Sequence, residues 1–394
     1  KENDRGQLIM APGTGKTFTS LKLVEKMAKQ TNKETFNVLY LVPSIQLLSQ
    51  TLIGWNNDTE LSMHSFAVTS DRNASKKKNA DELSAKDIGF PATTDSEKLL
   101  SNYKKIENNQ RDLTVVYSTY QSIEVLHEAQ EKGFPEFDII ICDEAHRTTG
   151  AKALGEEASV FTRVHNNNYI KANKRLYQTA TPKIYGTDAK QKAEDSSIVL
   201  SSMDDKDIYG EEIFRLGFGQ AVSNDILTDY KVMVLAVDEK VIQKDMQRVL
   251  SDSENGLDVD DVSKLIGVWN GLMKRSSVDK DAVFEGKPMQ RAISFINTIN
   301  NSKKISSQFN EVVNEYLEGN ESIQQSINVR HVDGMMNTLE KKEALDWLSE
   351  DFAEDETRVL SNVKFLTEGI DVPNLDARSE EHTSEPSHLE QSRM

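Results

Sequence analysis

Two short segments of the chain carry side chains that could bind and cleave a phosphorylated ligand. The first is Met10-Ala-Pro-Gly-Thr-Gly-Lys-Thr17, which follows an apolar run and opens a helical stretch. Its glycines allow backbone amides to turn toward phosphate oxygens, Lys16 can reach the β and γ oxygens, and Thr17 can offer its hydroxyl to Mg²⁺. The residues expected at the nucleotide are Gly13, Thr14, Gly15, Lys16 and Thr17. The alternative is a turn with no ligand, since Met10 stands where the strict pattern has glycine.

The second segment, Asp138-Ile-Ile-Ile-Cys-Asp-Glu-Ala-His146, is typical of a buried strand that ends at two adjacent carboxylates. At such a strand end, Asp143 can hold the Mg²⁺ shell while Glu144 orients and deprotonates the attacking water. The two segments together predict hydrolysis of ATP with Mg²⁺. The residues alone leave two other interpretations: the carboxylates could cap the following helix, and His146 could be a structural histidine.

The elements that must position these loops alternate between strand-like and helical stretches. In the first part of the chain we expect strands at residues 8–11, 38–42, 65–69, 113–118 and 138–142, with helices at 16–29 and 45–55. A parallel doubly wound sheet requires short apolar runs of this kind, buried on both faces and separated by helices. The predicted fold class is therefore α/β.

A second series of the same kind follows a polar, helix-rich middle segment. Here we expect strands at residues 291–296, 328–332 and 358–362, with helices at 303–317 and 339–347. The strand-helix logic is repeated without a short-period repeat, so the chain is predicted to form two α/β domains. The tryptophans Trp55, Trp269 and Trp347 lie in helical stretches and are expected in the core.

Bulk composition limits the remaining possibilities. The chain has 394 residues, 37% apolar and 28% charged, which describes an ordinary globular protein of about two domains. No apolar run approaches the ~20 residues of a membrane span, so we expect no membrane partner and a cytoplasmic location. The net charge of −17 argues against coating nucleic acid by bulk electrostatics. Any DNA contact is therefore expected along one local track.

With Asp143-Glu-Ala-His146 in place, the chain resembles a superfamily 2 helicase of the DEAH-box type. That resemblance implies two RecA-like domains with an ATP cleft between them, at residues 1–232 and 233–377, the second with a helical insert at about 243–285. It also places His146 with Lys16, Asp143 and Glu144 in the catalytic group. Residues 378–394 lack apolar periodicity and resemble a non-native tail, so we exclude them from the fold.

Further segments resemble helicase motifs that contact nucleic acid or couple it to ATP. Residues 40–44, 67–71 and 118–122 resemble backbone-binding motifs, which implies contacts from Pro43, Ser44, Thr69, Ser118 and Thr119. Thr179-Ala-Thr-Pro182 resembles the coupling motif, which implies a hydrogen-bond relay through Thr179 and Thr181. Each match is short, and each could be a plain strand end.

The second half carries a longer match. Residues 360–373 resemble motif V, which implies that Thr367 faces nucleic acid and that Gly369 and Asp371 approach the nucleotide. The family expects an arginine-bearing motif next, and it is missing. Because such an arginine can contribute a thousandfold or more to turnover, we expect ATP binding with poor hydrolysis from this chain alone.

Wider stretches narrow the resemblance to one branch of the superfamily. Residues 41–51, 142–150, 174–182 and 202–210 look like the motor segment of large single-polypeptide restriction–modification enzymes. The resemblance implies a type I- or type III-like motor that pumps duplex DNA and is fused to nuclease and methyltransferase domains. Two other functions stay open: an ATP-dependent DNA clamp without turnover, and an RNA helicase.

Overall fold

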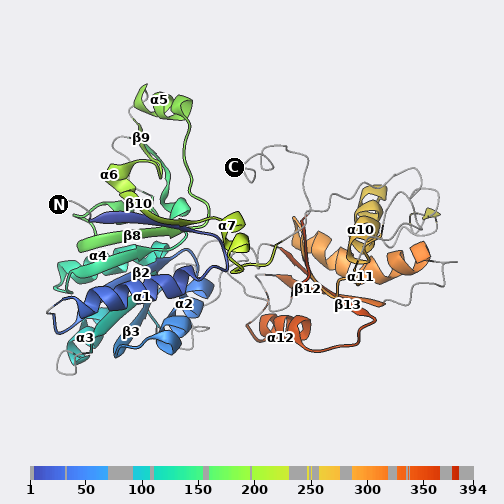
Figure 1. Cartoon of the computed structure of the whole chain (residues 1–394), viewed down its shortest axis with the longest axis horizontal. Helices are drawn as coiled ribbons and strands as arrows, with labels where there is room; N and C mark the ends of the chain where they lie inside the picture. The colour runs from blue at the N-terminus through green and yellow to red at the C-terminus, as the bar shows by residue number, and fades with distance from the viewer. Residues whose placement is uncertain are drawn as a thin grey trace. The chain divides into compact units, whose positions relative to one another are not determined.

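Two compact units make up the chain, with the division near residue 230. The computed structural model describes residues 4–31, 33–69, 92–106, 111–153, 159–195, 198–229, 246–247, 250, 257–275, 286–317, 326–333, 336, 338–363 and 375–380. Figure 1 shows a parallel sheet within each unit. Among the described residues, no helix is long and apolar enough to cross a lipid bilayer.

The first unit is built on an eight-stranded sheet in the order β10-β1-β8-β6-β2-β5-β3-β4. Every pairing in it is parallel. Its strands are β1 (Arg5–Met10), β2 (Phe36–Val42), β3 (Met63–Val68), β4 (Ala92–Thr93), β5 (Leu113–Thr119), β6 (Phe137–Cys142), β8 (Ala172–Thr179) and β10 (Glu211–Leu216). The predicted doubly wound parallel sheet is confirmed.

Helices cover both faces of this sheet because successive strand residues point to opposite sides. Along β2, Val38 and Tyr40 pack with α1 (Lys16–Lys29) and α2 (Ile45–Asp58). The intervening Leu39 and Leu41 pack with α3 (Ser96–Ile106) and α4 (Ile123–Glu131). All three strongly apolar central strands, β2, β5 and β6, are buried along their whole length or nearly so. The core is therefore continuous on the two faces.

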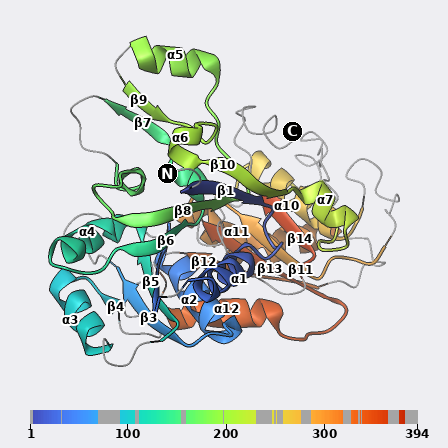
Figure 2. The same ribbon diagram turned by 60° about the vertical axis from the view of Figure 1, so that its left-hand side comes forward.

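A small two-stranded sheet and one helix extend from the first unit, beyond the segments that follow β6 and β8. The strands β7 (Gly150–Ala153) and β9 (Ile198–Ser201) pair antiparallel, and α5 (Thr187–Asp195) lies beyond them (Figure 2). The remaining short elements of this unit are η3 (Tyr120–Ser122), η4 (Ala145–Thr148), η5 (Arg163–His165), α6 (Lys206–Tyr209) and α7 (Phe218–Ser223). In the chain, β7 comes directly after η4, whereas α5 lies between β8 and β9.

The second unit holds a four-stranded parallel sheet in the order β12-β13-β11-β14. Its elements are α10 (Val259–Leu272), β11 (Arg291–Phe295), α11 (Ile299–Leu317), β12 (Ser326–Asp333), α12 (Thr338–Ser349), β13 (Glu356–Val363) and β14 (Ala377–Glu380). Trp269 packs with α11 on one face, and Trp347 packs on the other. With Trp55 in the first unit, all three tryptophans are buried as predicted.

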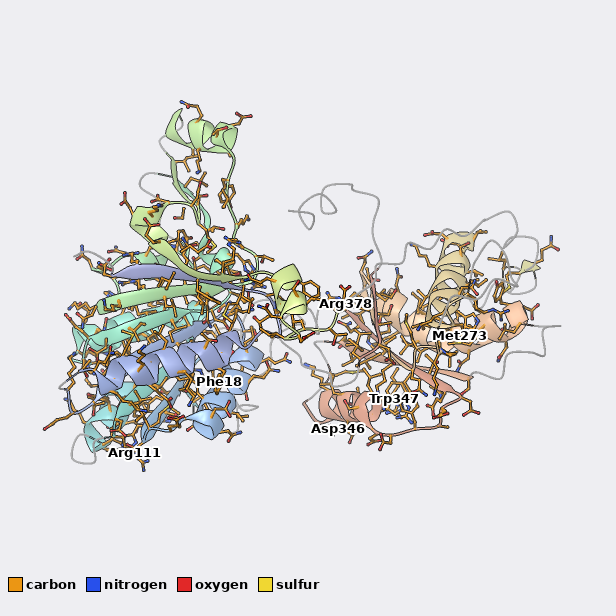
Figure 3. The ribbon with its side chains drawn as sticks, in the orientation of Figure 1. Phe18, Arg111, Met273, Asp346, Trp347 and Arg378 are labelled. Carbon is orange, nitrogen blue, oxygen red and sulfur yellow. The ribbon has the colours of Figure 1, made fainter. Side chains whose placement is uncertain are left out.

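The exclusion of residues 378–394 from the fold is wrong for its first three residues. Arg378, Ser379 and Glu380 belong to β14, which pairs in parallel with β11. Arg378 is labelled in Figure 3. Its guanidinium lies 4.1 Å from the ring centroid of Phe295. The polar composition misled the prediction because an edge strand is held mainly by main-chain hydrogen bonds, which need no apolar side chains.

Candidate active site

The sheet order of the first unit brings three predicted loops to one edge. β1, β8 and β6 are neighbours, and all run in the same direction. Their carboxyl ends lead into the loop before Lys16, to Thr179 and to Asp143, respectively. In open parallel sheets, ligands bind in the region outside the carboxyl ends of the strands. The structure therefore places the predicted phosphate loop, carboxylates and coupling residue in the position where a nucleotide is expected.

The phosphate loop has the backbone shape that its glycines predict. Gly13 and Gly15 have φ values of 77° and 85°, a left-handed region that side-chain-bearing residues rarely adopt. Gly15 caps α1 without any side-chain hydrogen bond, which leaves the first amides of the helix available to an anion. Thr14 Oγ1 donates to the Ala11 carbonyl at 2.6 Å and closes the turn.

The side chains of Lys16 and Met10, at the two ends of this loop, point to different surroundings. The Lys16 ammonium lies 3.4 Å from the Met10 carbonyl oxygen, so the side chain is folded back over the loop. The Met10 side chain is buried in the core beneath α1 and α2. The departure from the strict glycine pattern is thus accommodated, because this side chain points away from the phosphate side.

Two adjacent carboxylates follow β6, as predicted, and the fold holds them in different ways. Asp143 is 5% exposed, and its amide donates to the Leu41 carbonyl at 2.9 Å. Its Oδ1 accepts hydrogen bonds from the Glu144 amide at 3.0 Å and from Gln178 Nε2 at 3.1 Å. Glu144 sits in the left-handed region at φ 46°, which turns its side chain away from that of Asp143. The short 3-10 helix η4 follows with Glu144 at its N-cap position and no side-chain cap hydrogen bond, so neither carboxylate caps an α-helix.

The environment moves the pKa values of the two carboxyl groups in opposite directions. Burial raises the pKa of Asp143 to about 7, assisted by the charge of Glu144 and opposed by Lys16. Burial also acts to raise the pKa of Glu144, but the hydrogen bond from His146 and the charge of Lys16 outweigh it and leave the pKa lowered. Glu144 is therefore ionised at neutral pH, as a general base must be. A divalent cation beside Asp143 would restore its charge.

Thr179 connects the carboxylates to the end of β8. Its hydroxyl lies 3.0 Å from His146 Nδ1 and 3.5 Å from Glu144 Oε2. The same hydroxyl accepts a hydrogen bond from the Thr181 amide at 3.2 Å. The structure thus brings Glu144, His146 and Thr179 together. Thr181 takes part through its main chain.

The residues predicted at nucleic acid gather at the ends of β2, β3 and β5, but most of their side chains face inward. Thr69, Ser118 and Thr119 are at most 4% exposed. The Thr119 hydroxyl is bonded to Ser122 Oγ at 2.9 Å. Pro43 is also buried, whereas Ser44 is partly exposed and caps α2 by accepting from the Leu47 amide at 3.3 Å. Contact through the inward-facing hydroxyls would require these side chains to turn.

Three predicted residues of motif V cannot be placed. Thr367, Gly369 and Asp371 lie outside the residues that the structure describes, as does about half of the predicted insert at 243–285. Within that insert, α10 is described and begins with a capping box between Asp258 and Asp261. The roles assigned to the three motif V residues stay predictions.

Sequence reasoning missed Gln178 and the hydroxyl of Tyr40. Gln178 is fully buried in β8, and its Nε2 donates to Asp143 Oδ1 at 3.1 Å and to the Tyr40 hydroxyl at 2.5 Å. One signal was available in the sequence. An amide side chain directly before Thr179 interrupts a strand whose interior should be apolar, and buried polar groups need partners.

The chain is similar in sequence and structure to known restriction enzymes. Residues 1–184 match the family model described as "Type III restriction enzyme, res subunit". The structure of the ATP-dependent type ISP restriction-modification enzyme LlaBIII bound to DNA is 60% identical with a TM-score of 0.84, over 96% of this chain and 24% of that one. A nuclease-deletion mutant of the type ISP enzyme LlaGI, in complex with a DNA substrate mimic, is 49% identical with a TM-score of 0.64, over 96% and 23%.

A more distant relative is described as a probable helicase of African swine fever virus. It is 23% identical over 379 residues, which is 96% of this chain and 35% of the viral protein. The chain therefore spans about a quarter of the two restriction enzymes and about a third of the viral relative. The predicted resemblance to helicase-type restriction motors is confirmed.

Proposed function

We propose that this chain, whose residues 1–184 carry the helicase-family domain of type III restriction enzyme res subunits, is the ATP-driven DNA-translocating segment of a restriction–modification enzyme. The observation that carries the proposal is the convergence of Lys16, Asp143, Glu144 and Thr179 at the carboxyl ends of three adjacent parallel strands. The similarity to the LlaBIII and LlaGI structures, both of which contain DNA or a DNA mimic, supports DNA as the track.

The proposed chemistry follows from the contacts already described. The loop amides and Lys16 would bind the β and γ phosphates, and Thr17 with Asp143 would hold Mg²⁺. The residues fit a hard cation, because Asp143 presents a buried carboxylate whose raised pKa signals an uncompensated charge. The cation would neutralise charge on the phosphates. Glu144 would orient the attacking water and accept its proton, while His146 and Thr179 hold the Glu144 carboxylate.

DNA binding is proposed to depend on local contacts along the ends of β2, β3 and β5. The net charge of −17 provides no long-range attraction for phosphates. The partly exposed Ser44 and the amides at the start of α2 are the groups best placed to meet a DNA backbone without reading its sequence. Binding should weaken as salt rises.

Several wider assignments belong to the same proposal. We propose the two RecA-like domains at residues 1–232 and 233–377, with Gly369 and Asp371 at the nucleotide and Thr367 at DNA. The whole protein would act in the cytoplasm and would also contain nuclease and methyltransferase domains. The small share of the LlaBIII chain that is covered, 24%, leaves room for such domains.

The test is ATP hydrolysis measured with and without duplex DNA. Lys16→Ala should lower DNA-stimulated turnover at least about a hundredfold, because the phosphates lose their main positive contact. Lys26→Ala is the matched control, since Lys26 lies on the exposed side of the same helix. Turnover that survives in Lys16→Ala would refute the proposal. Stimulation by RNA in place of DNA would favour an RNA helicase, and ATP-dependent DNA binding without turnover would favour a clamp.

A further inference from the structure

Gln178 occupies an unusual position for a buried amide. It lies inside β8 with no exposure, and its Nε2 donates to two oxygens, Asp143 Oδ1 at 3.1 Å and the Tyr40 hydroxyl at 2.5 Å. Its own Oε1 is buried and has no partner among the described residues. A buried acceptor without a donor costs about 1–3 kcal/mol, so it calls for an explanation.

Tyr40 extends this contact toward the phosphate loop. The phenol is fully buried on β2, and Trp55 packs edge-on against its ring at 5.1 Å between centroids. The Trp55 indole Nε1 then donates to the Thr17 carbonyl at 3.0 Å. Burial and the charge of Asp143 raise the pKa of the Tyr40 phenol, against hydrogen-bonding contacts from Ser20, Gln178 and Thr17. Tyr40 therefore stays protonated and touches the first turn of α1.

These contacts link the two residues that are expected to hold Mg²⁺. Asp143 lies at one end, directly after β6, and Thr17 lies at the other, on α1. Gln178 Nε2 and the Glu144 main-chain amide both donate to Asp143 Oδ1. Among the described residues, no donor contacts Asp143 Oδ2. The carboxylate is thus held by one oxygen, and the second oxygen is left for a cation.

We infer that Gln178 and Tyr40 form a buried positioning bridge that sets the spacing between Thr17 and Asp143 and thereby tunes affinity for the divalent cation of the nucleotide. The inference rests on the proposed function. It also accounts for the lone Gln178 Oε1, because Mg²⁺ usually keeps several of its waters and such a water could donate to this oxygen. Groups that hold a metal ligand in place typically contribute 10–100-fold to metal affinity.

The test measures metal dependence rather than turnover. A fluorescent ATP analogue is bound to the full chain while Mg²⁺ is titrated, and binding is also measured in a chelator. Gln178→Leu should raise the Mg²⁺ midpoint at least about tenfold and leave metal-free nucleotide affinity unchanged. Tyr40→Phe should raise the midpoint by a smaller factor, because it removes only the hydroxyl.

Matched controls come from buried residues of the same unit. Gln130 is a buried amide that bonds the carbonyls of Pro135 and Lys171, and Tyr117 is the buried phenol that pairs with Tyr40 on the next strand. Gln130→Leu and Tyr117→Phe should leave the Mg²⁺ midpoint unchanged. Thermal unfolding of every variant shows whether the fold is intact, and Tyr40→Phe decides the matter if Gln178→Leu does not fold.

The outcomes separate this inference from the proposed function. If the unaltered protein shows no Mg²⁺-dependent nucleotide binding, the proposed function fails. If it binds and hydrolyses ATP but folded Gln178→Leu and Tyr40→Phe have unchanged midpoints, only the bridge is overturned. Midpoints that rise equally in the two control variants would also overturn it, since the effect would then be general loss of packing.

Discussion

Each unit buries a network of hydrogen-bonded polar side chains beside its parallel sheet. The two networks differ in whether every buried polar atom has a hydrogen-bond partner. In the second unit, Ser302 Oγ on α11 lies 2.7 Å from His331 Nδ1 on β12 and 2.6 Å from Ser361 Oγ on β13. His331 Nε2 lies 2.7 Å from Asp333 Oδ2. In the first unit, Gln178 joins Asp143 and Tyr40 but keeps an unpartnered buried oxygen among the described residues.

The two networks differ in role: one stabilises the fold, and the other lies at the proposed cation site. In the second unit the hydroxyls and both ring nitrogens satisfy one another, so the network can fasten α11 to two strands without any ligand. In the first unit the network ends in a carboxylate whose pKa is raised to about 7, mainly by burial, and a bound cation would complete it. We therefore expect changes in the first network to alter chemistry and changes in the second to alter stability.

The largest expected effect is on chemistry in the first unit. Glu144→Gln removes the proposed general base while keeping its size, so ATP turnover should fall about a thousandfold. Nucleotide binding and the urea midpoint of unfolding should stay close to those of the unaltered protein, because Glu144 is not part of the core. Steady-state hydrolysis and equilibrium binding provide the two measurements. Turnover within tenfold of the unaltered protein would mean that another group takes the proton.

The second unit should show the opposite response. Ser302→Ala removes the hydroxyl shared by His331 and Ser361, and both partners are then left buried with an unmade hydrogen bond. The free energy of unfolding should fall by about 1–3 kcal/mol, with nucleotide binding to the first unit unchanged. Urea unfolding followed by tryptophan fluorescence measures the loss. Ser307→Ala, on the solvent side of the same helix, is the control, and equal losses in the two variants would show that the buried network adds no stability of its own.

A third buried polar network, around His165 in the first unit, should respond to pH. His165 Nδ1 lies 3.0 Å from the Tyr177 hydroxyl, and Nε2 lies 3.0 Å from the Thr148 carbonyl. Burial, together with the charges of Arg5 and Arg175, lowers the pKa of His165 to about 4, against the hydrogen bond with Thr148. The ring is therefore neutral in the folded protein at neutral pH.

The sign of the pH effect follows from linkage. Between pH 6.5 and 4 the unfolded chain binds a proton at this histidine and the folded chain does not, so stability falls as pH falls. The ring is partly exposed, so we expect a loss of about 1–2 kcal/mol from pH 7 to pH 5. His165→Gln should remove that part of the slope. Comparing urea midpoints of the two proteins at both pH values isolates it, and parallel slopes would contradict the assignment.

Much of the first unit could be predicted because local sequence determines it. The helix after the phosphate loop was predicted at residues 16–29, which are the bounds of α1. The strands that precede the proposed catalytic residues were predicted to within a few positions. Apolar runs and glycine spacing act over short distances, so they are readable without a structure. The order of the motifs placed Thr179 after the carboxylates, but its contacts with Glu144 and His146 were not predicted.

Other features depend on contacts that sequence alone does not fix. β10 lies at the sheet edge beside β1, although Ile213 and Phe214 are exposed and give no strand pattern that points inward. Thr69, Ser118 and Thr119 lie at the predicted strand ends with buried side chains, because helices cover both faces of this sheet. Their role at nucleic acid stays a prediction. Gln178 was missed because its partners lie on two other strands.

The backbone conformation of Glu144 lowers the stability of the turn that positions its carboxylate. Among the described residues it is one of three non-glycine residues with positive φ, together with Asp225 and Lys274. Holding an L-residue in this conformation costs about 1–2 kcal/mol, so glycine or asparagine would make the turn after β6 more stable. Neither could supply a carboxylate. A search for stabilising substitutions in this protein would therefore select against the residue on which its proposed activity depends.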